Sequence, residues 1–381
     1  MQTKKLELYF HIPFCVRKCL YCDFLSAPAD EETKHKYMEA LLTETVGSAV
    51  QYQEYCVDSV FIGGGTPSVA DLKDVEALLQ AVRKYYNVSP DAEVTMEVNP
   101  GTVDAQKLAG YVKAGVNRLS IGMQSANDEE LKRLGRIHTW ADFVRTFTDA
   151  RKVGFCNINV DVMSALPGQT LDSFEETLEK VLSLQDAPEH ISAYSLIVEE
   201  GTPFGVMYEE GRLPIPDEEE DRLMYHRTKE MLKAAGYYRY EISNYAKEGF
   251  ACRHNQGYWT RKNYVGFGIG AASLVENVRF RNGDDIVTYM QNPTGCRESE
   301  EVIDVNGQME ETMFLGLRLT DGVDSVLFHS TYSKTLEDVY GEVIARNITD
   351  GLLCWKDPGH KLALTENGLD VSNYVMAQFL L

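Results

Sequence analysis

A chain of 381 residues is longer than one compact core usually supports, so we expect one large domain and a smaller one. Hydrophobic residues make up 44% and charged residues 25%, a globular balance that excludes the disordered and fibrous classes. The net charge of −21 disfavours nucleic acid and anionic membrane surfaces as partners, because it repels phosphate groups. The sequence has no apolar run long enough for a transmembrane segment and no signal peptide, which predicts a cytoplasmic protein.

Short β-rich runs alternate with amphipathic helical patterns through the first 235 residues. The predicted strands are residues 6–10, 59–63, 94–98, 118–121, 158–163 and 190–196. The predicted helices are residues 32–50, 70–86, 104–114, 141–153, 173–184 and 218–235, and three of them end at Gly115, Gly154 and Gly236. Parallel strands need such crossover connections, so the sequence predicts an α/β fold, a partial (β/α)6 barrel. Its chemistry should lie on the loops that follow the strands.

The pattern changes after Gly236, and we divide the chain into a barrel (1–235), a linking segment (236–299) and a small C-terminal domain (300–381). In the linking segment a predicted strand (237–242) precedes an irregular, aromatic-rich stretch (244–264). The C-terminal domain has helical patterns, a predicted hairpin and a final helix, at residues 309–317, 336–347, 352–364 and 368–380. This order resembles a winged-helix α+β module, and the acidic net charge favours a packing or lid role over DNA binding.

Three of the eight cysteines, Cys15, Cys19 and Cys22, lie together just after the first predicted strand. A structural zinc site normally uses four ligands in paired short spacings. A C-x3-C-x2-C triplet without a nearby fourth partner instead fits a cubane iron–sulfur cluster with one iron left open. Zinc and unliganded thiols are the alternatives. The scattered cysteines are expected to be reduced and mostly buried: Cys56, Cys156, Cys252, Cys296 and Cys354.

The cysteine spacing resembles the signature of the radical S-adenosylmethionine (AdoMet) superfamily. The resemblance implies a 4Fe-4S cluster on the three cysteines, AdoMet on the open iron, and an electron donor that reduces the cluster. It also implies reductive cleavage of AdoMet to methionine and a 5′-deoxyadenosyl radical, chemistry that the cofactors supply. The segment Gly63-Gly64-Gly65-Thr66-Pro67 follows the second predicted strand, as the superfamily's glycine-rich segment does. Glycine there would let the backbone approach the AdoMet amino group.

The block His-Ile-Pro-Phe-Cys at residues 11–15 is similar to the family that contains oxygen-independent coproporphyrinogen III dehydrogenases and heme chaperones of the HemW type. Further matches lie at residues 96–100, 120–125, 134–136, 159–163 and 166–170. Around the AdoMet that meets the cluster, the resemblance implies Tyr9, Gly64 and Glu97. Around a second AdoMet, it implies Tyr21, Gly65, Thr66, Gln124, Arg136 and Asp161.

Two departures favour the chaperones over the dehydrogenases. Phe24 stands where the dehydrogenases carry another cysteine, and a chain that starts eight residues before Tyr9 is expected to lack their long N-terminal segment. The HNxxYW motif of the chaperones is matched at residues 254–259, which implies heme contacts by His254, Asn255, Tyr258 and Trp259. Imidazole is a common axial ligand and aromatic rings pack on a macrocycle. Cys252 is a rival thiolate ligand, and a role of the motif in shaping the pocket is the alternative.

The leading hypothesis is a chaperone that binds heme, the cluster and AdoMet and delivers heme to apo-hemoproteins. The alternatives are enzymes: radical oxidative decarboxylation of coproporphyrinogen III, or radical cleavage of the heme ring. Fold does not separate these readings, because function lies in the site. The residues leave open the acceptor, the electron donor, the axial ligand, AdoMet cleavage during transfer, and formation of a homodimer.

Overall fold

The first strand shows how the apolar pattern of the sequence orients the sheet. In β1 (Lys4–Ile12) Leu8 and Phe10 are fully buried in the main hydrophobic core, against the helices. Glu7 and Tyr9 alternate with them and face the opposite side, because successive side chains of a strand point to opposite faces. That opposite face is the interior of the curved sheet, and it carries the polar residues of the site.

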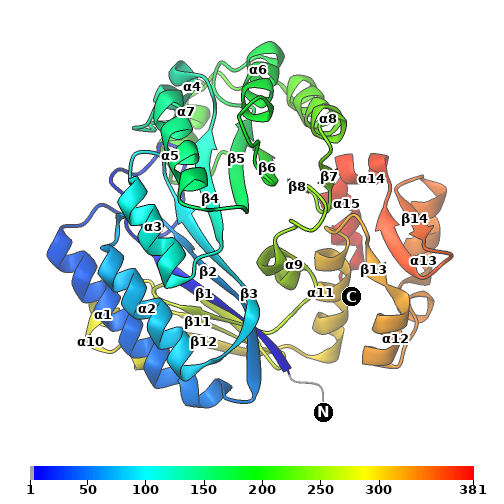
Figure 1. The fold of residues 1–381 in the computed structure, drawn as a ribbon. Helices are drawn as coiled ribbons and strands as arrows, with labels where there is room; N and C mark the ends of the chain where they lie inside the picture. The colour runs from blue at the N-terminus through cyan, green and yellow to red at the C-terminus, as the bar shows by residue number, and fades with distance from the viewer. Residues whose placement is uncertain (1–3) are drawn as a thin grey trace.

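Twelve strands form one mixed sheet within residues 4–381, the part of the chain that the computed structural model describes (Figure 1). The central six strands run parallel in chain order, which confirms the predicted partial (β/α)6 arrangement. They are β1, β2 (Tyr55–Gly64), β3 (Asn87–Val98), β4 (Arg118–Gln124), β5 (Ile158–Ser164) and β6 (His190–Ser195).

Helices cover the outer face of this arc, and each of the six predicted crossover helices is present. They are α1 (Glu31–Ser48), α2 (Leu72–Tyr85), α3 (Ala105–Ala114), α5 (Trp140–Lys152), α6 (Leu171–Leu182) and α8 (Glu218–Ala234). Every one starts at an aspartate or threonine whose side chain accepts a backbone N–H of the first turn, which is a strong start signal: Asp30, Asp71, Asp104, Thr139, Thr170 and Asp217. Within the predicted barrel the structure has four shorter helices that were not predicted: α4 (Asp128–Arg133), α7 (Pro203–Glu209), η1 (Ala49–Tyr52) and η2 (Pro67–Val69).

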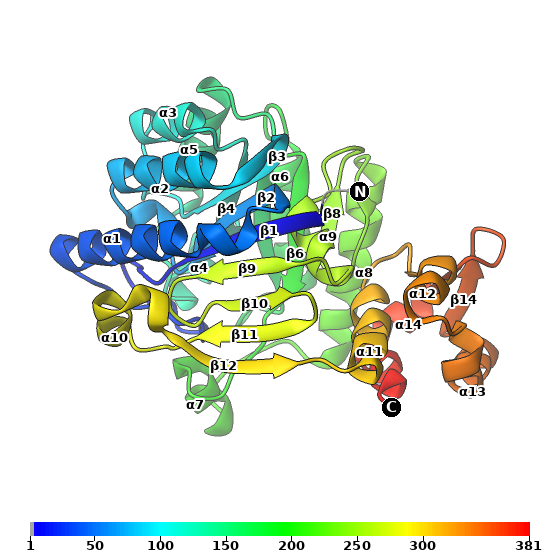
Figure 2. The same cartoon turned by 90° about the horizontal axis from the view of Figure 1, so that it is seen from below.

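The linking segment differs from its prediction because it adds six strands to the same sheet. Two follow β6 and four extend the sheet beyond β1, as Figure 2 shows. They are β7 (Tyr238–Arg239), β8 (Asn244–Ala246), β9 (Tyr264–Phe267), β10 (Ala272–Val275), β11 (Val278–Asn282) and β12 (Arg297–Val302). The stretch 244–264, expected to be irregular, contains β8 and α9 (Arg253–Trp259), and α10 (Ile286–Gln291) and η3 (Pro293–Gly295) precede β12.

The charged edge strand β12 explains why the sheet extension escaped the sequence pattern. All six of its residues are exposed and its sequence is Arg-Glu-Ser-Glu-Glu-Val, so it has no apolar alternation. Charged edges of this kind prevent pairing with other chains. The division at residues 235 and 299 stays a prediction; β12 itself runs across the second of these positions.

The last part of the chain forms a small sheet and its own hydrophobic core. Its strands have the order β13-β15-β14, and β14 and β15 are the predicted hairpin. The elements are α11 (Val305–Gly316), β13 (Val323–Asp324), α12 (Ser325–Tyr332), α13 (Leu336–Thr349), β14 (Leu353–Lys356) and β15 (Lys361–Leu364). The predicted final helix was wrong as one element: it is divided into α14 (Glu366–Asp370), α15 (Ser372–Met376) and η4 (Ala377–Phe379). The break lies at Val371, whose φ of −123° is not helical.

Among residues 4–381, no helix combines the length and the apolar character that a bilayer crossing requires. The predicted cytoplasmic location stays a prediction.

Candidate functional site

The three predicted cluster ligands lie on the loop between β1 and α1, which backbone hydrogen bonds close at its base. Cys15 N–H donates to the Ala27 carbonyl at 3.2 Å, and Ala27 N–H donates to the Pro13 carbonyl at 2.9 Å. The loop is also held near its middle, because Leu20 N–H donates to the Leu134 carbonyl at 3.0 Å and its side chain packs in the same apolar cluster as Leu134. All three thiols are free and partly exposed at the carboxyl ends of the strands.

Two of the three sulfurs accept hydrogen bonds from side chains on other loops. Thr66 Oγ1 donates to Cys15 Sγ at 3.5 Å, and Arg136 Nη1 donates to Cys19 Sγ at 3.7 Å. Burial raises the pKa of Cys22, and the neighbouring thiols of Cys19 and Cys15 raise it further. Donors beside sulfur suit thiolates that carry the charge of a cluster. The donor set therefore fits the predicted iron–sulfur cluster.

The thiols are not arranged as the ligands of a single ion. Within residues 4–381 no three histidine, cysteine, aspartate or glutamate side chains converge on one point in that way. In a cubane each thiolate binds a different iron, so a cluster does not depend on such convergence.

The glycine-rich turn after β2 approaches the cysteine loop so closely that side chains would obstruct it. A Cβ at Gly65 would lie 2.7 Å from the Phe14 carbonyl oxygen and 3.0 Å from Cys15 Sγ. Gly64 has a φ of +116°, a conformation that favours glycine, and its N–H donates to Glu97 Oε2 at 3.2 Å. The turn thus joins the cysteine loop to the end of β3.

Glu97 is half-buried at the end of β3, and the pKa of its carboxyl group is raised to about 8. Burial is the main cause and the charge of Asp161 adds to it, whereas the Gly64 N–H and Arg118 act in the opposite direction. Tyr9 faces the same interior, where burial, and then Glu97, raise its pKa. The residues predicted to surround the first AdoMet are therefore neighbours on the inner face of the sheet.

His11 connects β1 with the far end of the cysteine loop, a role that its motif did not indicate. Its Nε2 lies 2.9 Å from the Leu25 carbonyl oxygen, and its Nδ1 lies 2.9 Å from Tyr9 Oη. A carbonyl oxygen only accepts, so Nε2 carries the proton and Nδ1 accepts from the Tyr9 hydroxyl. His11 thereby orients the Tyr9 side chain.

The residues predicted for a second AdoMet approach the same interior from β4, β5 and the cysteine loop. Gln124 ends β4 with a φ of +71°, and its Oε1 accepts from Tyr194 Oη at 3.3 Å. Asp161 Oδ1 accepts from Asn159 Nδ2 at 2.7 Å, and burial raises the pKa of Asp161. Burial also raises the pKa of Tyr21, which lies between two cluster ligands. The grouping of these residues around a second AdoMet stays a prediction.

Asn99 is a site residue that the sequence reasoning missed. Its Nδ2 donates to Thr66 Oγ1 at 2.7 Å, and its Oδ1 accepts from Arg136 Nη2 at 2.8 Å. Arg136 Nε is buried without a partner among residues 4–381, which leaves one donor for an anionic ligand. The motif at residues 96–100 is the sequence signal that points to Asn99.

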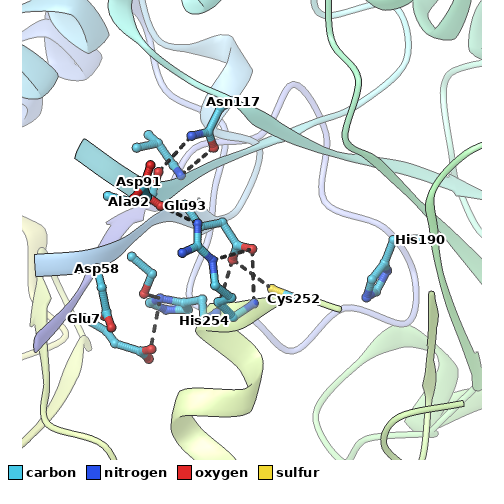
Figure 3. Close-up of polar contacts among 12 residues, drawn as sticks. Glu7, Asp58, Asp91, Ala92, Glu93, Asn117, His190, Cys252 and His254 are labelled. Atoms are coloured by element: carbon cyan, nitrogen blue, oxygen red, sulfur yellow. Dashed lines mark hydrogen bonds and ion pairs between the residues drawn. The ribbon is translucent and has the colours of Figure 1, made fainter. Parts of the chain in front are cut away.

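The HNxxYW motif lies in α9, inside the arc of strands and at the amino ends of β1–β3 (Figure 1). Glu93 of β3 caps this helix: its Oε1 accepts from His254 N–H at 3.2 Å and from Cys252 Sγ at 3.4 Å. Its Oε2 accepts from Arg253 N–H at 3.1 Å, as Figure 3 shows. A carboxylate at a helix N-terminus is stabilising because of the helix dipole. The motif therefore closes the barrel at the end opposite the cysteines.

His254, labelled in Figure 3, is 1% exposed. Both nitrogens of its ring have hydrogen-bond partners. Nδ1 lies 2.8 Å from Ser59 Oγ, Nε2 lies 3.1 Å from Tyr258 Oη, and the ring stacks on Phe61 at 5.1 Å. Burial and the charges of Lys262 and Arg118 lower its pKa to about 3. An imidazole in this position does not face a ligand, so its predicted ligation of heme stays a prediction that requires α9 to move.

The aromatic half of the motif lies beside an open pocket of about 400 Å³. Tyr258 and Trp259 line it together with Tyr264, Arg279 and Phe314, the last from α11. Trp259 Nε1 is buried without a partner in the described part of the chain.

The other two residues predicted to contact heme, Asn255 and Cys252, do not line this pocket. Asn255 is half-buried within α9. Cys252, the rival ligand, is fully buried, and burial raises the pKa of its thiol to about 12.

Comparison with known proteins agrees with this geometry. The family model described as the radical SAM superfamily matches residues 9–181, and that of the HemN C-terminal domain matches residues 303–371. The chain is 35% identical to the heme chaperone HemW of Lactococcus lactis, over 100% of this chain and 99% of that protein. It is 36% identical to the heme chaperone HemW of Bacillus subtilis, over 98% of each. The solved structure of coproporphyrinogen III oxidase (HemN) from Escherichia coli superposes with a TM-score of 0.86 at 21% identity, covering 99% of this chain and 90% of that one.

A parallel half-barrel with three cysteines after β1 and a glycine turn after β2 defines a radical SAM protein, a superfamily that implies a 4Fe-4S cluster and AdoMet. The likeness to the HemN structure concerns the fold alone. Since the relatives match over their full length, the chain belongs to the HemW family.

Proposed function

We propose that this chain is a heme chaperone that carries a 4Fe-4S cluster and AdoMet and passes heme to apo-hemoproteins. The proposal is carried by the full-length match to proteins named heme chaperones. The structure adds a pocket whose chemistry suits the cargo. Heme presents a flat apolar ring and two carboxylates, which aromatic walls and a guanidinium would recognise.

The pocket beside α9 has those components. Tyr258 and Tyr264 pack edge to face with ring centroids 4.7 Å apart, and Phe314 lines the same space. Arg279 contributes its guanidinium and donates to Glu311 at 2.8 Å. Arg261 donates to the other oxygen of Glu311, so two guanidinium groups share one carboxylate.

At the other end of the barrel the chain's residues would hold the cofactors. Cys15, Cys19 and Cys22 would bind the cluster, and Tyr9, Gly64 and Glu97 would surround AdoMet. When bound, the reduced cluster supplies the electron that cleaves the AdoMet sulfonium. Four further points remain predictions. They are a second AdoMet near Gln124, Arg136 and Asp161, an electron donor, the acceptor proteins and a homodimer.

A heme titration of the anaerobically reconstituted protein tests the proposal. Heme should bind at micromolar concentration or below and shift its Soret band. Trp259→Leu and Arg279→Met should each weaken binding about tenfold, equivalent to about 1.4 kcal/mol. Arg145→Met is the matched control, because Arg145 lies on the outer face of α5 in an exposed pair with Asp142. Failure to bind heme at micromolar concentration would overturn the chaperone function. If Arg145→Met lost as much heme affinity as the two pocket variants, the assignment of heme to this pocket would be wrong.

Product analysis separates the chaperone from the dehydrogenase. Phe24, 64% exposed on the cysteine loop, stands in place of the extra cysteine of the dehydrogenases. We expect no decarboxylation of coproporphyrinogen III by protein with a full cluster and a reductant. Turnover at about one per second, an ordinary enzyme rate, would contradict the proposal.

A further inference from the structure

Three side chains form a continuous hydrogen-bond chain between two of the cluster sulfurs. It runs from Cys15 Sγ through Thr66 and Asn99 to Arg136 and ends on Cys19 Sγ. Asn99 is at its centre and touches neither sulfur.

The direction of every bond in this chain follows from the chemistry of the groups. A guanidinium only donates, so the Asn99 atom that meets Arg136 Nη2 at 2.8 Å is its oxygen, Oδ1. The amide nitrogen of Asn99 must then be the atom 2.7 Å from Thr66 Oγ1, and it donates there. Because that hydroxyl oxygen accepts from Asn99, its own proton is directed toward Cys15 Sγ. Asn99 thus settles the orientation of both donors that reach the sulfurs.

The backbone holds Asn99 in place independently of its side chain. Its carbonyl oxygen accepts from Thr102 N–H at 3.1 Å and from Thr102 Oγ1 at 2.7 Å, in a turn directly after β3. Its N–H donates to Ser68 Oγ at 3.4 Å. A substitution of the side chain therefore leaves this turn with its hydrogen bonds.

A glycine on β4 leaves room for the central pair. A Cβ at Gly122 would lie 2.7 Å from Asn99 Oδ1 and 2.9 Å from Arg136 Nη2. The Gly122 carbonyl oxygen also accepts from Arg136 Nη2. The space and the acceptor together keep the guanidinium between Asn99 and Cys19.

We propose that Asn99 is a positioning residue that directs the Thr66 hydroxyl and the Arg136 guanidinium onto two of the three cluster sulfurs and thereby raises the reduction potential of the cluster. The proposal rests on the cluster assigned under the proposed function and not on heme. Reduction adds one negative charge to the cluster, and hydrogen-bond donors on its sulfurs stabilise the more negative state.

The test is an anaerobic redox titration of the full chain with a reconstituted cluster, without AdoMet, read by the spectrum of the reduced cluster. In Asn99→Leu the ratio of reduced to oxidised cluster at a fixed applied potential should fall about tenfold, 59 mV for a one-electron couple. Thr66→Val should give a smaller fall, because it removes one of the two donors. Adding Thr66→Val to Asn99→Leu should change the ratio by less than it does alone, since Asn99 acts through Thr66.

Asn347→Leu is the matched control, a buried asparagine of the C-terminal domain whose loss should lower stability and leave the potential unchanged. An unchanged potential in Asn99→Leu with full iron and sulfide would overturn the proposal, as would strictly additive effects in the double variant. If Asn99→Leu assembles no cluster, Gly122→Ala is the second test, because its methyl group crowds the Asn99–Arg136 pair without removing a donor. The reduction potential of the cluster should then fall in Gly122→Ala, and an unchanged potential would overturn the proposal. An unmodified protein that holds no cluster would overturn both this proposal and the cluster assignment, whatever the heme titration shows.

Discussion

At the carboxyl ends of the parallel strands the three cysteine thiols are partly exposed, whereas at the amino ends Glu93 and His254 are buried where α9 packs on the sheet. The three thiols are partly exposed and Arg136 Nε has no partner among residues 4–381. At the other end Glu93 is 4% exposed and accepts three hydrogen bonds from the start of α9. A site for exchangeable ligands needs free donors, and a closed barrel end needs satisfied ones. The HNxxYW motif contributes to both a closed barrel end and a pocket. His254 closes the barrel, whereas Tyr258 and Trp259 line the pocket.

The largest expected effect is loss of the cluster at the open end. Cys19→Ala should remove nearly all bound iron and sulfide from the anaerobically reconstituted protein, because three thiolates are the minimum set for the cubane. Cys156→Ala is the control, since that exposed thiol lies outside the site and its loss should leave the cluster content unchanged. Iron and sulfide analysis decides, and full cluster content in Cys19→Ala would refute the assignment.

A substitution at the closed end should lower stability and spare the cluster. His254→Ala removes a buried ring with two hydrogen-bonded nitrogens, so the free energy of unfolding should fall by about 3 kcal/mol. Urea unfolding at pH 7.5 measures it, with exposed His329→Ala as the control. If His254→Ala is stable and instead shifts the Soret band of bound heme, the imidazole is a ligand and the comparison between the two ends fails.

Glu97 at the open end and His254 at the closed end should contribute to the pH dependence of stability with opposite signs. The pKa of Glu97 is raised to about 8, so between pH 4.5 and 8 the unfolded chain loses a proton that the folded one keeps, and stability falls as pH rises. The pKa of His254 is lowered to about 3, so between pH 3 and 6.5 the unfolded chain binds a proton that the folded one does not, and stability rises with pH. Each slope is at most about 1.4 kcal/mol per pH unit.

Glu97→Gln should lessen the falling slope, to which Glu7 and Glu44 also contribute because burial raises their pKa values to about 8 and about 7. His254→Gln should lessen the rising slope. Unfolding free energies across pH 4 to 8, measured without AdoMet, test both. Parallel pH curves for Glu97→Gln and the unmodified chain would show that Glu97 is ionised in the folded state.

Much of the barrel and of its open end was predictable from the sequence, because those features rest on local signals. The aspartate and threonine caps fix where helices begin, and the spacing of the cysteines and the position of Glu97 at a strand end indicate the site. The hydrogen-bond chain through Asn99 was not predictable, because it depends on contacts between the loops that follow β2, β3 and α4. The burial of His254 was missed for the same reason: its partners Ser59 and Phe61 are nearly 200 residues away in the chain.

That sequence separation has a consequence for how the chain folds. The cap of Glu93 on the N–H of His254 spans 161 residues. Closing a flexible loop of that length costs roughly 4.5 kcal/mol of chain entropy, so the contact cannot form early on its own. During synthesis from the N-terminus, β1 to β6 are complete before α9 exists, and Glu7, Ser59 and Glu93 face an interior that lacks its closing helix. Arrival of α9 is therefore a late step that completes the barrel, and variants weakening this contact should mainly speed unfolding rather than slow folding.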